Sequence, residues 1–168
     1  KHTSGGRIMS ANNEWGIIPD PSKWVIFDVD GTLMDIRERR KFVEQKPKDW
    51  NSFNNHKNVM MDKPFDAVFL LAKTLQEAGF GIILSSGRKQ SLETITLQQV
   101  QKEGLSPDMW FFRSETDYRP DSELKASHLN KIRAEGIEPI MAFDDRDSVV
   151  DFWRSEGIKT FQPERGNF

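Results

Sequence analysis

Two aspartates one residue apart, Asp28 and Asp30, directly follow the apolar run WVIF and precede Gly31-Thr32. A continuous apolar run of this length is typical of a strand buried on both faces. Side chains alternate along an extended backbone, so both carboxylates are predicted to point to one side and share a small volume. Buried like charges need a cation or a shared proton to offset their repulsion. This spacing therefore indicates a site for cation-assisted chemistry.

The same residue types also have a purely structural interpretation. Asp30-Gly31 suits a turn at the end of a strand, because both residue types are favoured in turns. The pair Asp144-Asp145 follows another apolar run and suits the cap of the next helix. A catalytic interpretation of these aspartates is favoured over a structural one only if other polar residues lie at the same edge of the fold.

Apolar runs alternate with helical patterns from residue 24 onward, and this alternation defines the elements. Strands are predicted over 24–27, 80–86, 109–112, 139–145 and 158–162, and helices over 62–79, 89–103, 122–135 and 146–157. Pro64 is placed in the first turn of the first helix, and Asp121 or Ser122 at the N-cap of the third. The polar segment 36–61 is predicted to be irregular.

Strands alternating with helices predict an α/β fold, a Rossmann-like parallel sheet of about five strands with helices on both faces. The domain is assigned to residues 23–168, with a short insert at about 34–63 that acts as a minimal cap. Residues 1–22 are assigned to an N-terminal arm, and the opening KHTSGG is treated as an expression remnant and left out of the fold prediction.

In a parallel α/β sheet the active site lies outside the carboxyl ends of the strands. The residues that follow the predicted strands are therefore expected to gather at one edge. They are Asp28 and Asp30 after the first strand, Ser85, Ser86, Gly87 and Arg88 after the second, Arg119, Asp121 and Lys125 after the third, and Asp144 and Asp145 after the fourth.

Composition narrows the class of protein. The net charge of −2 gives no global basic field, so binding of nucleic acid would depend on a local patch. The absence of cysteine excludes disulfides, thiolate nucleophiles and zinc–thiolate sites. No apolar run is long enough to cross a membrane and no signal peptide is recognisable, so no membrane partner and a cytoplasmic location are expected.

With these residues in place, the chain resembles the haloacid dehalogenase-like phosphohydrolases. DVDGT at 28–32, Ser86, Lys125 and Asp144-Asp145 match the four motifs of that superfamily in order. The segments FDVDGT, SSGR, RPDSELK and AFDDRDSVVDFWRSEGI, with the ending RGNF, are similar to the 3′-phosphatase domain of phage-type polynucleotide kinase-phosphatase. The kinase half's phosphate-binding loop has no counterpart in this sequence, so a free-standing phosphatase module is expected.

The resemblance implies catalytic roles. Asp28 would attack phosphorus and form an aspartyl-phosphate, and Asp30 would act as general acid and then base. Mg²⁺ would be held by Asp28, by the backbone carbonyl of Asp30 and by Asp145 as the direct ligand of the Asp144-Asp145 pair. Ser86 would hydrogen-bond the phosphoryl group, and Lys125 would balance its charge.

The resemblance also implies substrate contacts. Arg39 and Arg88 would hold substrate or phosphoryl oxygens, because a guanidinium matches phosphate geometry. Asp121 would orient Lys125 or an arginine. Gly87 and Thr32 are assigned to substrate binding through the motifs that contain them.

Three functions compete at this point. The first is a metal-dependent phosphomonoesterase that acts on phosphorylated nucleic-acid ends, chiefly 3′-phosphates, in nucleic-acid repair. The second is a phosphatase of small substrates such as nucleoside monophosphates, and the short insert leaves room for either. The third is a non-catalytic module that binds phosphorylated ends, which the filled catalytic positions disfavour. DNA or RNA as the polymer, and the oligomeric state, stay open.

Aromatic residues and histidines outside the motifs receive structural interpretations. His2, His56 and His128 are interpreted as structural or surface residues. Trp50 and Phe53 lie in the insert, where packing is favoured over stacking on a nucleobase.

Overall fold

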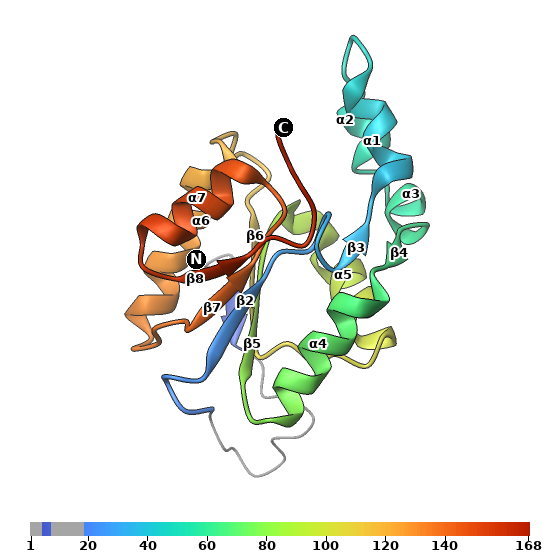
Figure 1. Ribbon diagram of the computed structural model, residues 1–168. Helices are drawn as coiled ribbons and strands as arrows, with labels where there is room; N and C mark the ends of the chain where they lie inside the picture. The colour runs from blue at the N-terminus through green and yellow to red at the C-terminus, as the bar shows by residue number, and fades with distance from the viewer. Residues whose placement is uncertain (1–4, 8–18) are drawn as a thin grey trace.

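The computed structural model describes residues 5–7 and 19–168, and residues 1–4 and 8–18 lie outside this description (Figure 1). The first half of the fold contains β1 (Gly5–Arg7), β2 (Trp24–Phe27), β3 (Met34–Asp35), α1 (Arg37–Glu44), α2 (Trp50–Phe53), α3 (His56–Met60), β4 (Lys63–Pro64) and α4 (Asp66–Glu77). The second half contains β5 (Gly81–Lys89), the 3₁₀ helix η1 (Gln90–Leu92), α5 (Glu93–Lys102), β6 (Met109–Arg113), α6 (Asp121–Ala134), β7 (Met141–Phe143), α7 (Asp147–Ser155) and β8 (Lys159–Phe161).

The main sheet has six strands in the order β1-β6-β5-β2-β7-β8. The five strands from β6 to β8 pair in parallel, which confirms the predicted parallel sheet. At one edge β1 pairs antiparallel with β6, and Gly5 lies opposite Phe111. Leaving KHTSGG out of the fold was therefore wrong, because Gly5 and Gly6 belong to this edge strand. The rest of the predicted arm up to residue 18 lies mostly outside the described residues.

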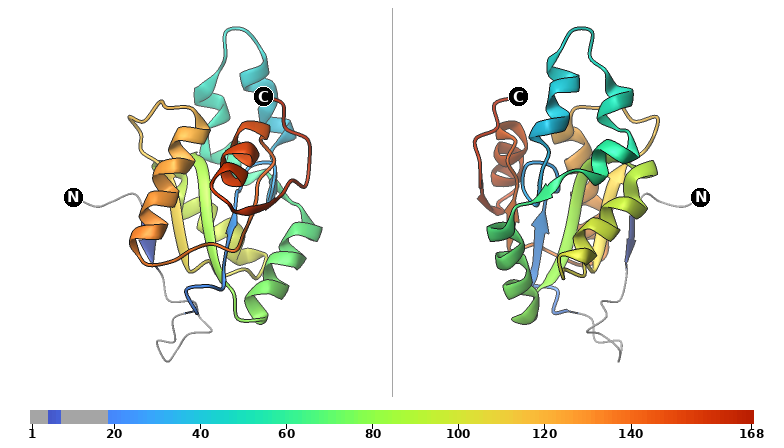
Figure 2. Two further views of the ribbon diagram at one scale, coloured as in Figure 1. Left: turned by 60° about the vertical axis from the view of Figure 1, so that its left-hand side comes forward. Right: turned by 90° about the vertical axis from the view of Figure 1, so that its right-hand side faces the viewer.

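The central strand β2 shows why its sequence is apolar throughout. Trp24 and Ile26 face one core cluster, and Val25 and Phe27 face the other, as the alternation of a strand requires. The first cluster is completed by α6 and α7, and the second by α4 and α5. Figures 1 and 2 show these helix pairs on opposite faces of the sheet. A strand covered on both faces has no position for a solvated side chain.

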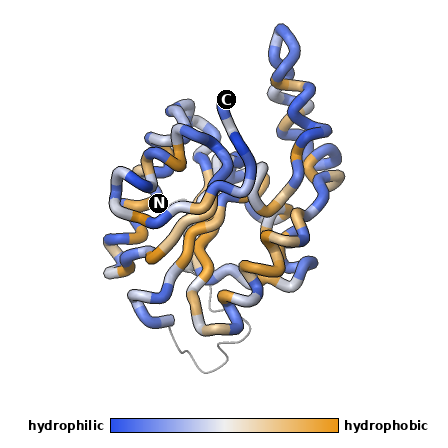
Figure 3. Tube along the Cα trace, in the orientation of Figure 1, coloured by the Kyte–Doolittle hydropathy of each residue, from blue (hydrophilic) through white to orange (hydrophobic). Residues whose placement is uncertain are grey.

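The apolar residues concentrate along the central strands, while the α1–α2 projection is mostly hydrophilic (Figure 3). No helix within the described ranges is long and apolar enough to cross a membrane.

The insert differs from its predicted irregular structure, because residues 36–61 form three short helices. Two of them begin at side-chain caps: Asp49 accepts from the Ser52 amide, and Asn55 accepts from the Lys57 amide. The helical periodicity was not visible in the sequence because these helices bury few apolar residues, Val59 being one. In α1 the buried residue is Arg39, a charged type that hydrophobic patterns do not count.

Several predicted boundaries also need correction. Pro64 lies in β4, where Met34 is its partner, and α4 begins after Phe65. At the start of α6 the N-cap is Pro120, so Asp121 is the first helical residue. The strand β5 continues to Lys89, so Gly87 and Arg88, which were predicted to follow the strand, lie within it. The segment predicted as one helix over 89–103 begins with the short η1.

Candidate active site

An acidic cluster lies at the carboxyl ends of the two central strands. Asp28 follows β2, and Asp144 and Asp145 follow β7, which pairs with β2 in parallel. One carboxylate oxygen from each of these three residues lies within 4.8 Å of the others, and all three residues are buried. The parallel register therefore brings together residues that are far apart in the sequence, as predicted from the strand ends.

The protonation behaviour of this cluster reflects its burial. Burial raises the pKa of Asp28 well above its ordinary value, and the neighbouring charge of Asp144 raises it further. Burial is also the main reason why the pKa of Asp145 is raised to about 6. A hard cation relieves this repulsion, and an all-oxygen donor set of this kind fits Mg²⁺. The residues present therefore fit the predicted metal.

Lys125 reaches this cluster from the first half of α6. Its Nζ donates to Oδ1 of Asp28 at 2.9 Å, to Oδ2 of Asp144 at 3.2 Å and to the carbonyl oxygen of Ser85. The side chain is almost fully buried, and burial alone would lower its pKa, but the carboxylates of Asp144 and Asp28 outweigh burial and raise it. Lys125 is therefore a fixed positive charge beside the Asp28 carboxylate.

Asp30 belongs to a second ionic network rather than to the carboxylates clustered with Asp28. Its Oδ1 accepts from Nε of Arg88 at 2.7 Å and from Nη2 of Arg39 at 3.3 Å. Burial raises its pKa, but the charges of Arg88 and Arg39 together lower it below the ordinary value. The two aspartates are thus compensated by different cations, and the expectation that their side chains share one space is corrected.

Asp62 completes the second network and was not identified from the sequence. Its two oxygens accept from Nε and Nη2 of Arg39 at 2.7 and 2.8 Å, and its Oδ2 also accepts from Nη2 of Arg88 at 2.8 Å. The side chain is 2% exposed. Asp62 precedes β4 in a segment without a recognisable motif, so no local signal distinguishes it from a surface aspartate.

Both arginines are buried and make further contacts that tie the insert to the sheet. Nη1 of Arg39 donates to the carbonyl oxygen of Phe53, whose ring lies 4.6 Å from the guanidinium carbon. Nη1 of Arg88 donates to Thr96 and Gln99 on α5. The structure therefore places both predicted phosphate-binding arginines against carboxylates of the protein, next to Asp30.

The small residues predicted for substrate binding also lie next to these charges. Oγ1 of Thr32 donates to Oδ2 of Asp28 at 3.3 Å. The buried Ser86 accepts at Oγ from the Arg88 amide at 3.0 Å. At Gly87 an added Cβ would lie 3.3 Å from Oδ1 of Asp121, so the glycine permits this close approach.

Asp121 contacts arginines, one of the two alternatives predicted for it. Its Oδ1 accepts from Nη2 of Arg113 at 2.5 Å, and its Oδ2 lies 3.3 Å from Nε of Arg146. Neither arginine was identified from the sequence. Arg146 directly follows Asp145, and this position beside a predicted metal ligand was an available signal.

The remaining candidates have mostly structural positions. His128 is buried, with Nδ1 2.8 Å from Oγ of Ser85 and Nε2 3.3 Å from the carbonyl oxygen of Phe112. Its structural interpretation agrees with these contacts, whereas His56 is exposed and His2 lies outside the described residues. The ring of Phe53 packs under Arg39, and Trp50 contacts it edge to face at a centroid distance of 5.7 Å.

Comparison with known proteins adds independent information. Residues 22–168 match the family model described as the polynucleotide kinase PNKP phosphatase domain. The chain is similar to a component of the structure titled Pnkp1/Rnl/Hen1 complex, with 27% identity and a TM-score of 0.72 over 88% of this chain and 48% of that one. A second structure, of the Pnkp1/Rnl/Hen1 RNA repair complex, matches with 27% identity and a TM-score of 0.71 over 100% of this chain and 48% of that one. The chain thus spans about half the length of these relatives.

More distant structures share the fold. A haloacid dehalogenase-like family hydrolase from Streptococcus pneumoniae has 12% identity and a TM-score of 0.61, over 84% of both chains. A predicted phosphatase from Clostridium acetobutylicum has 13% identity and a TM-score of 0.63, again over 84% of both chains.

Proposed function

The chain belongs to the family of polynucleotide kinase phosphatase domains, and from this premise we propose that it hydrolyses terminal phosphates of nucleic acid. The preferred substrate in this proposal is a polynucleotide 3′-phosphate, and the reaction passes through an aspartyl-phosphate. The observation that carries the proposal is the position of Asp28, whose carboxylate accepts from the ammonium of Lys125 and clusters with the carboxylates of Asp144 and Asp145.

Asp28 is the nucleophile in this proposal. One of its carboxylate oxygens attacks phosphorus while the bond from phosphorus to the ester oxygen of the substrate breaks. Thr32 and Lys125 each donate to a different oxygen of Asp28 and hold the carboxylate in one orientation. Asp28, the backbone carbonyl of Asp30 and Asp145 or Asp144 would hold Mg²⁺, which would supply positive charge for the phosphate oxygens.

Asp30 transfers the proton in both steps. It gives a proton to the departing ester oxygen and later takes one from the water that attacks phosphorus, which releases inorganic phosphate and restores Asp28. Arg88 and Arg39 favour the ionised form of Asp30, the form that accepts a proton from water. A phosphate dianion beside Asp30 adds a like charge and raises the pKa of Asp30, which favours the protonated form needed first.

The charge of the phosphoryl group is balanced by fixed donors. Lys125 is already held at Asp28, and Ser86 and Gly87 lie in β5 at the same edge of the sheet. Arg39 and Arg88 add two positive charges next to Asp30, where they attract the phosphate while holding the proton donor. Asp121 pairs with Arg113 and Arg146, which are further cations of the site in this proposal. Catalysis of phosphoryl transfer depends mainly on positioning and on preorganised charge of this kind.

A nucleic-acid end is favoured over a small nucleotide by the family match, and the similarity to chains of complexes described as Pnkp1/Rnl/Hen1 supports the same choice. The insert consists of three short helices, which is less than a full cap domain. A short insert leaves space for the rest of a polymer beyond its terminal phosphate.

The test compares two substrates that carry the same leaving group. Phosphate release from a 3′-phosphorylated oligonucleotide and from a nucleoside 3′-monophosphate is measured with Mg²⁺ for wild type and for Asp28→Asn. We expect kcat/KM to favour the oligonucleotide and Asp28→Asn to abolish both activities while the circular dichroism spectrum is retained. Equal kcat/KM values would favour the small-nucleotide phosphatase, and a wild type inactive on both would favour the binding module.

A further inference from the structure

The segment that follows β8, residues 162–168, turns back over the loop that carries Asp144 and Asp145. Figure 1 shows this segment rising beside the start of α7 toward the projecting helices of the insert. The contacts of this segment fall into three groups, made by Gln162, Gly166 and Phe168. We call residues 162–168 the tail segment.

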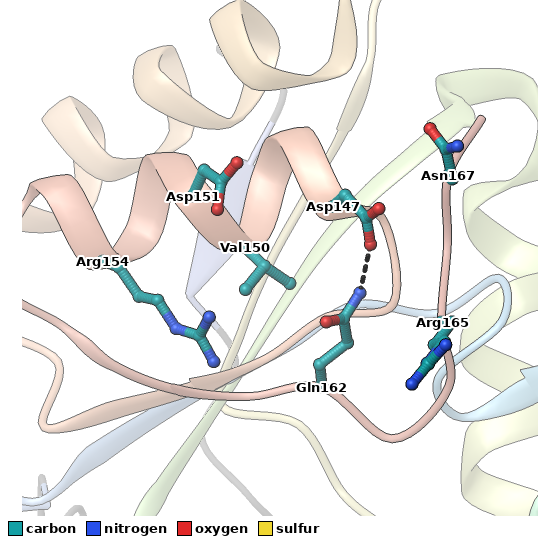
Figure 4. Close-up of a pocket in the computed structure, with 7 residues that line it drawn as sticks. All are labelled: Asp147, Val150, Asp151, Arg154, Gln162, Arg165 and Asn167. Atoms are coloured by element: carbon teal, nitrogen blue, oxygen red, sulfur yellow. Dashed lines mark hydrogen bonds between the residues drawn. The ribbon is translucent and has the colours of Figure 1, made fainter.

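Gln162 holds the main chain at Asp145. Its Nε2 donates to the carbonyl oxygen of Asp145 at 2.8 Å and to Oδ1 of Asp147 at 2.6 Å. Figure 4 shows the second of these bonds at the edge of a pocket of about 510 Å³ between α7 and the tail segment. The Gln162 amide therefore bridges the backbone of Asp145, a predicted metal ligand, and the side chain of Asp147, the first residue of α7.

Gly166 contacts the loop that carries Asp144 and Asp145 where this loop enters α7. Its carbonyl oxygen accepts from the Asp147 amide at 2.8 Å, and its amide donates to Oδ1 of Asp147 at 3.3 Å. A Cβ added at Gly166 would lie 2.0 Å from the carbonyl oxygen of Asp145, so only glycine fits this approach. On the carboxylate side, a Cβ at Gly31 would lie 2.0 Å from Oδ2 of Asp145. Asp145 is thus packed between two glycines.

Phe168 joins the tail segment to the insert. Its ring lies 4.2 Å from the guanidinium carbon of Arg40 on α1 and 4.7 Å from that of Arg146, which precedes α7. A guanidinium is attracted to the face of an aromatic ring, so both contacts hold the end of the chain. The tail segment therefore has an anchor beyond Gly166.

We propose that Gln162 and Gly166 are positioning residues for the metal site, because they fix the main chain of Asp145 and so the direction of its carboxylate. The inference rests on the metal site of the proposed function. The Cβ of any other residue at position 31 would overlap the Asp145 carboxylate, and at position 166 it would overlap the Asp145 carbonyl oxygen, so the position of Asp145 depends on both glycines. Loss of either tail contact gives the carboxylate freedom that metal binding must then remove.

The expected consequence is weaker metal binding rather than a changed reaction. Residues that orient a ligand from behind typically alter metal affinity by about 10- to 100-fold when they are replaced. Gln162→Met keeps the length of the side chain and removes its two donated hydrogen bonds. We expect this variant to bind Mg²⁺ about 10-fold more weakly. Gly166→Ala is expected to weaken binding at least as much, because its Cβ displaces the Asp145 carbonyl.

Two matched controls separate positioning from general stability. Gln76→Met removes an amide that bonds the main chain of Ser106 through both its nitrogen and its oxygen, far from the acidic cluster. Gly136→Ala places a side chain at a φ of +77° in open space, so it strains the backbone without pressing on any neighbour. Both controls are expected to lower the melting temperature and leave the Mg²⁺ affinity at the wild-type value.

The experiment measures the Kd of Mg²⁺ by isothermal titration calorimetry without substrate, for wild type, these four variants and Asp145→Asn. High Mg²⁺ should restore the kcat of Gln162→Met. The tail proposal is overturned if Gln162→Met binds Mg²⁺ like wild type while Asp145→Asn has lost binding. If Asp145→Asn also binds like wild type, the metal site itself is wrong and the positioning role falls with it. Because Gln162→Met adds no bulk, the test stands even if Gly166→Ala fails to fold.

Discussion

At the scale of single residues, the site separates two aspartates that are almost adjacent in the chain. Asp28 lies with Lys125 and the other acidic residues, and its pKa is raised mainly by burial. Asp30 lies with Arg88 and Arg39, whose charges overcome burial and lower its pKa. Pairs of titratable groups with opposite environments are typical of sites in which each group has a different role. The separation supports one role in attack and another in proton transfer.

The proton-transfer role predicts a dependence on the leaving group. Asp30→Asn should lower kcat strongly, by about 100-fold or more, on a 3′-phosphorylated oligonucleotide, whose leaving alkoxide needs a proton. The loss should be smaller on nitrophenyl phosphate, because nitrophenolate departs without one. Single-turnover rates on both substrates give the comparison. An equal loss on the two would contradict proton donation in the first step.

Asp62 provides a test of the second network. Asp62→Asn retains one acceptor for Arg39, but the new amide donor faces the Arg88 guanidinium, and two buried positive charges lose a partner. Breaking a buried ion pair in this way typically costs about 3–5 kcal/mol. We expect a lower free energy of unfolding and a reduced kcat on every phosphate ester.

The matched control for Asp62 is Asp49→Asn in the same insert. Asp49 caps α2 through bonds to the amide and hydroxyl of Ser52, and it has no contact with the two arginines. Asn caps a helix about as well as Asp, so this replacement should leave both the free energy of unfolding and kcat close to the wild-type values. Asp62→Asn with wild-type kcat and stability would show that the buried network is not needed.

At the scale of elements, α6 and β5 form the contact that places Lys125. Lys125 and His128 lie three residues apart, so they share one face of α6. Lys125 donates to the carbonyl oxygen of Ser85, and His128 contacts the hydroxyl of the same residue. One residue of β5 thus holds α6 through its backbone and its side chain, and this contact supports the Lys125 position at Asp28.

The burial of His128 against Ser85 makes the free energy of unfolding depend on pH. Burial, with the nearby charge of Lys125, lowers the pKa of His128 from 6.5 to about 3. Between these pH values the unfolded chain binds the proton and the folded chain does not, so the contribution of His128 is present above pH 6.5 and is lost as the pH falls. The slope is about 1.4 kcal/mol per pH unit.

His128→Gln should therefore be destabilised at pH 7.5, and the difference from wild type should shrink as the pH falls from about 6.5 to 5. Urea unfolding at a series of pH values gives the free energies. A difference that stays constant over this range would mean that His128 keeps its proton in the folded protein.

At the scale of the whole molecule, the net charge is small but the charged residues are distributed unevenly over the surface. The net charge is −2, while α1 carries exposed basic residues next to the buried Arg39. Arg37 and Lys41 are four residues apart and share a face of this helix. Because Arg39 is buried against Asp30 and Asp62, its removal is expected to impair every substrate. We therefore expect the exposed basic residues of α1 to give the preference for a polymer over a small phosphate ester.

The double variant Arg37→Gln/Lys41→Gln should raise the KM of a 3′-phosphorylated oligonucleotide at low salt. The KM of nitrophenyl phosphate should stay at its wild-type value. Each lost phosphate contact should reduce the slope of log affinity against log salt by about 1. The matched control is Arg133→Gln at the end of α6, which removes an exposed arginine paired with Glu138 and Glu156. An oligonucleotide KM that is independent of salt in wild type would contradict polymer binding through this helix.

The sequence by itself was sufficient for the parallel sheet and for the acidic end of the site. Continuous apolar runs mark strands covered on both faces, and side chains after parallel strands must meet at one edge of the sheet. Asp28 and Asp145 were therefore predictable in position, and the family could be recognised from the spacing of its motifs. The antiparallel edge strand β1 was missed, since Gly5–Arg7 carries no apolar pattern.

Only the tertiary structure decided which charges compensate one another. Arg39 meets Asp62 across 23 residues, and Lys125 meets Asp28 across 97, through side chains whose partners no local pattern specifies. The insert was predicted to be irregular because its three helices bury little apolar surface: α1 buries Arg39, α3 buries Val59 and α2 buries no residue. The two-glycine packing of Asp145 likewise depends on the tail segment folding back. Long-range contacts of polar groups follow from the packing of elements, and the periodicity of a sequence records mainly which faces are apolar.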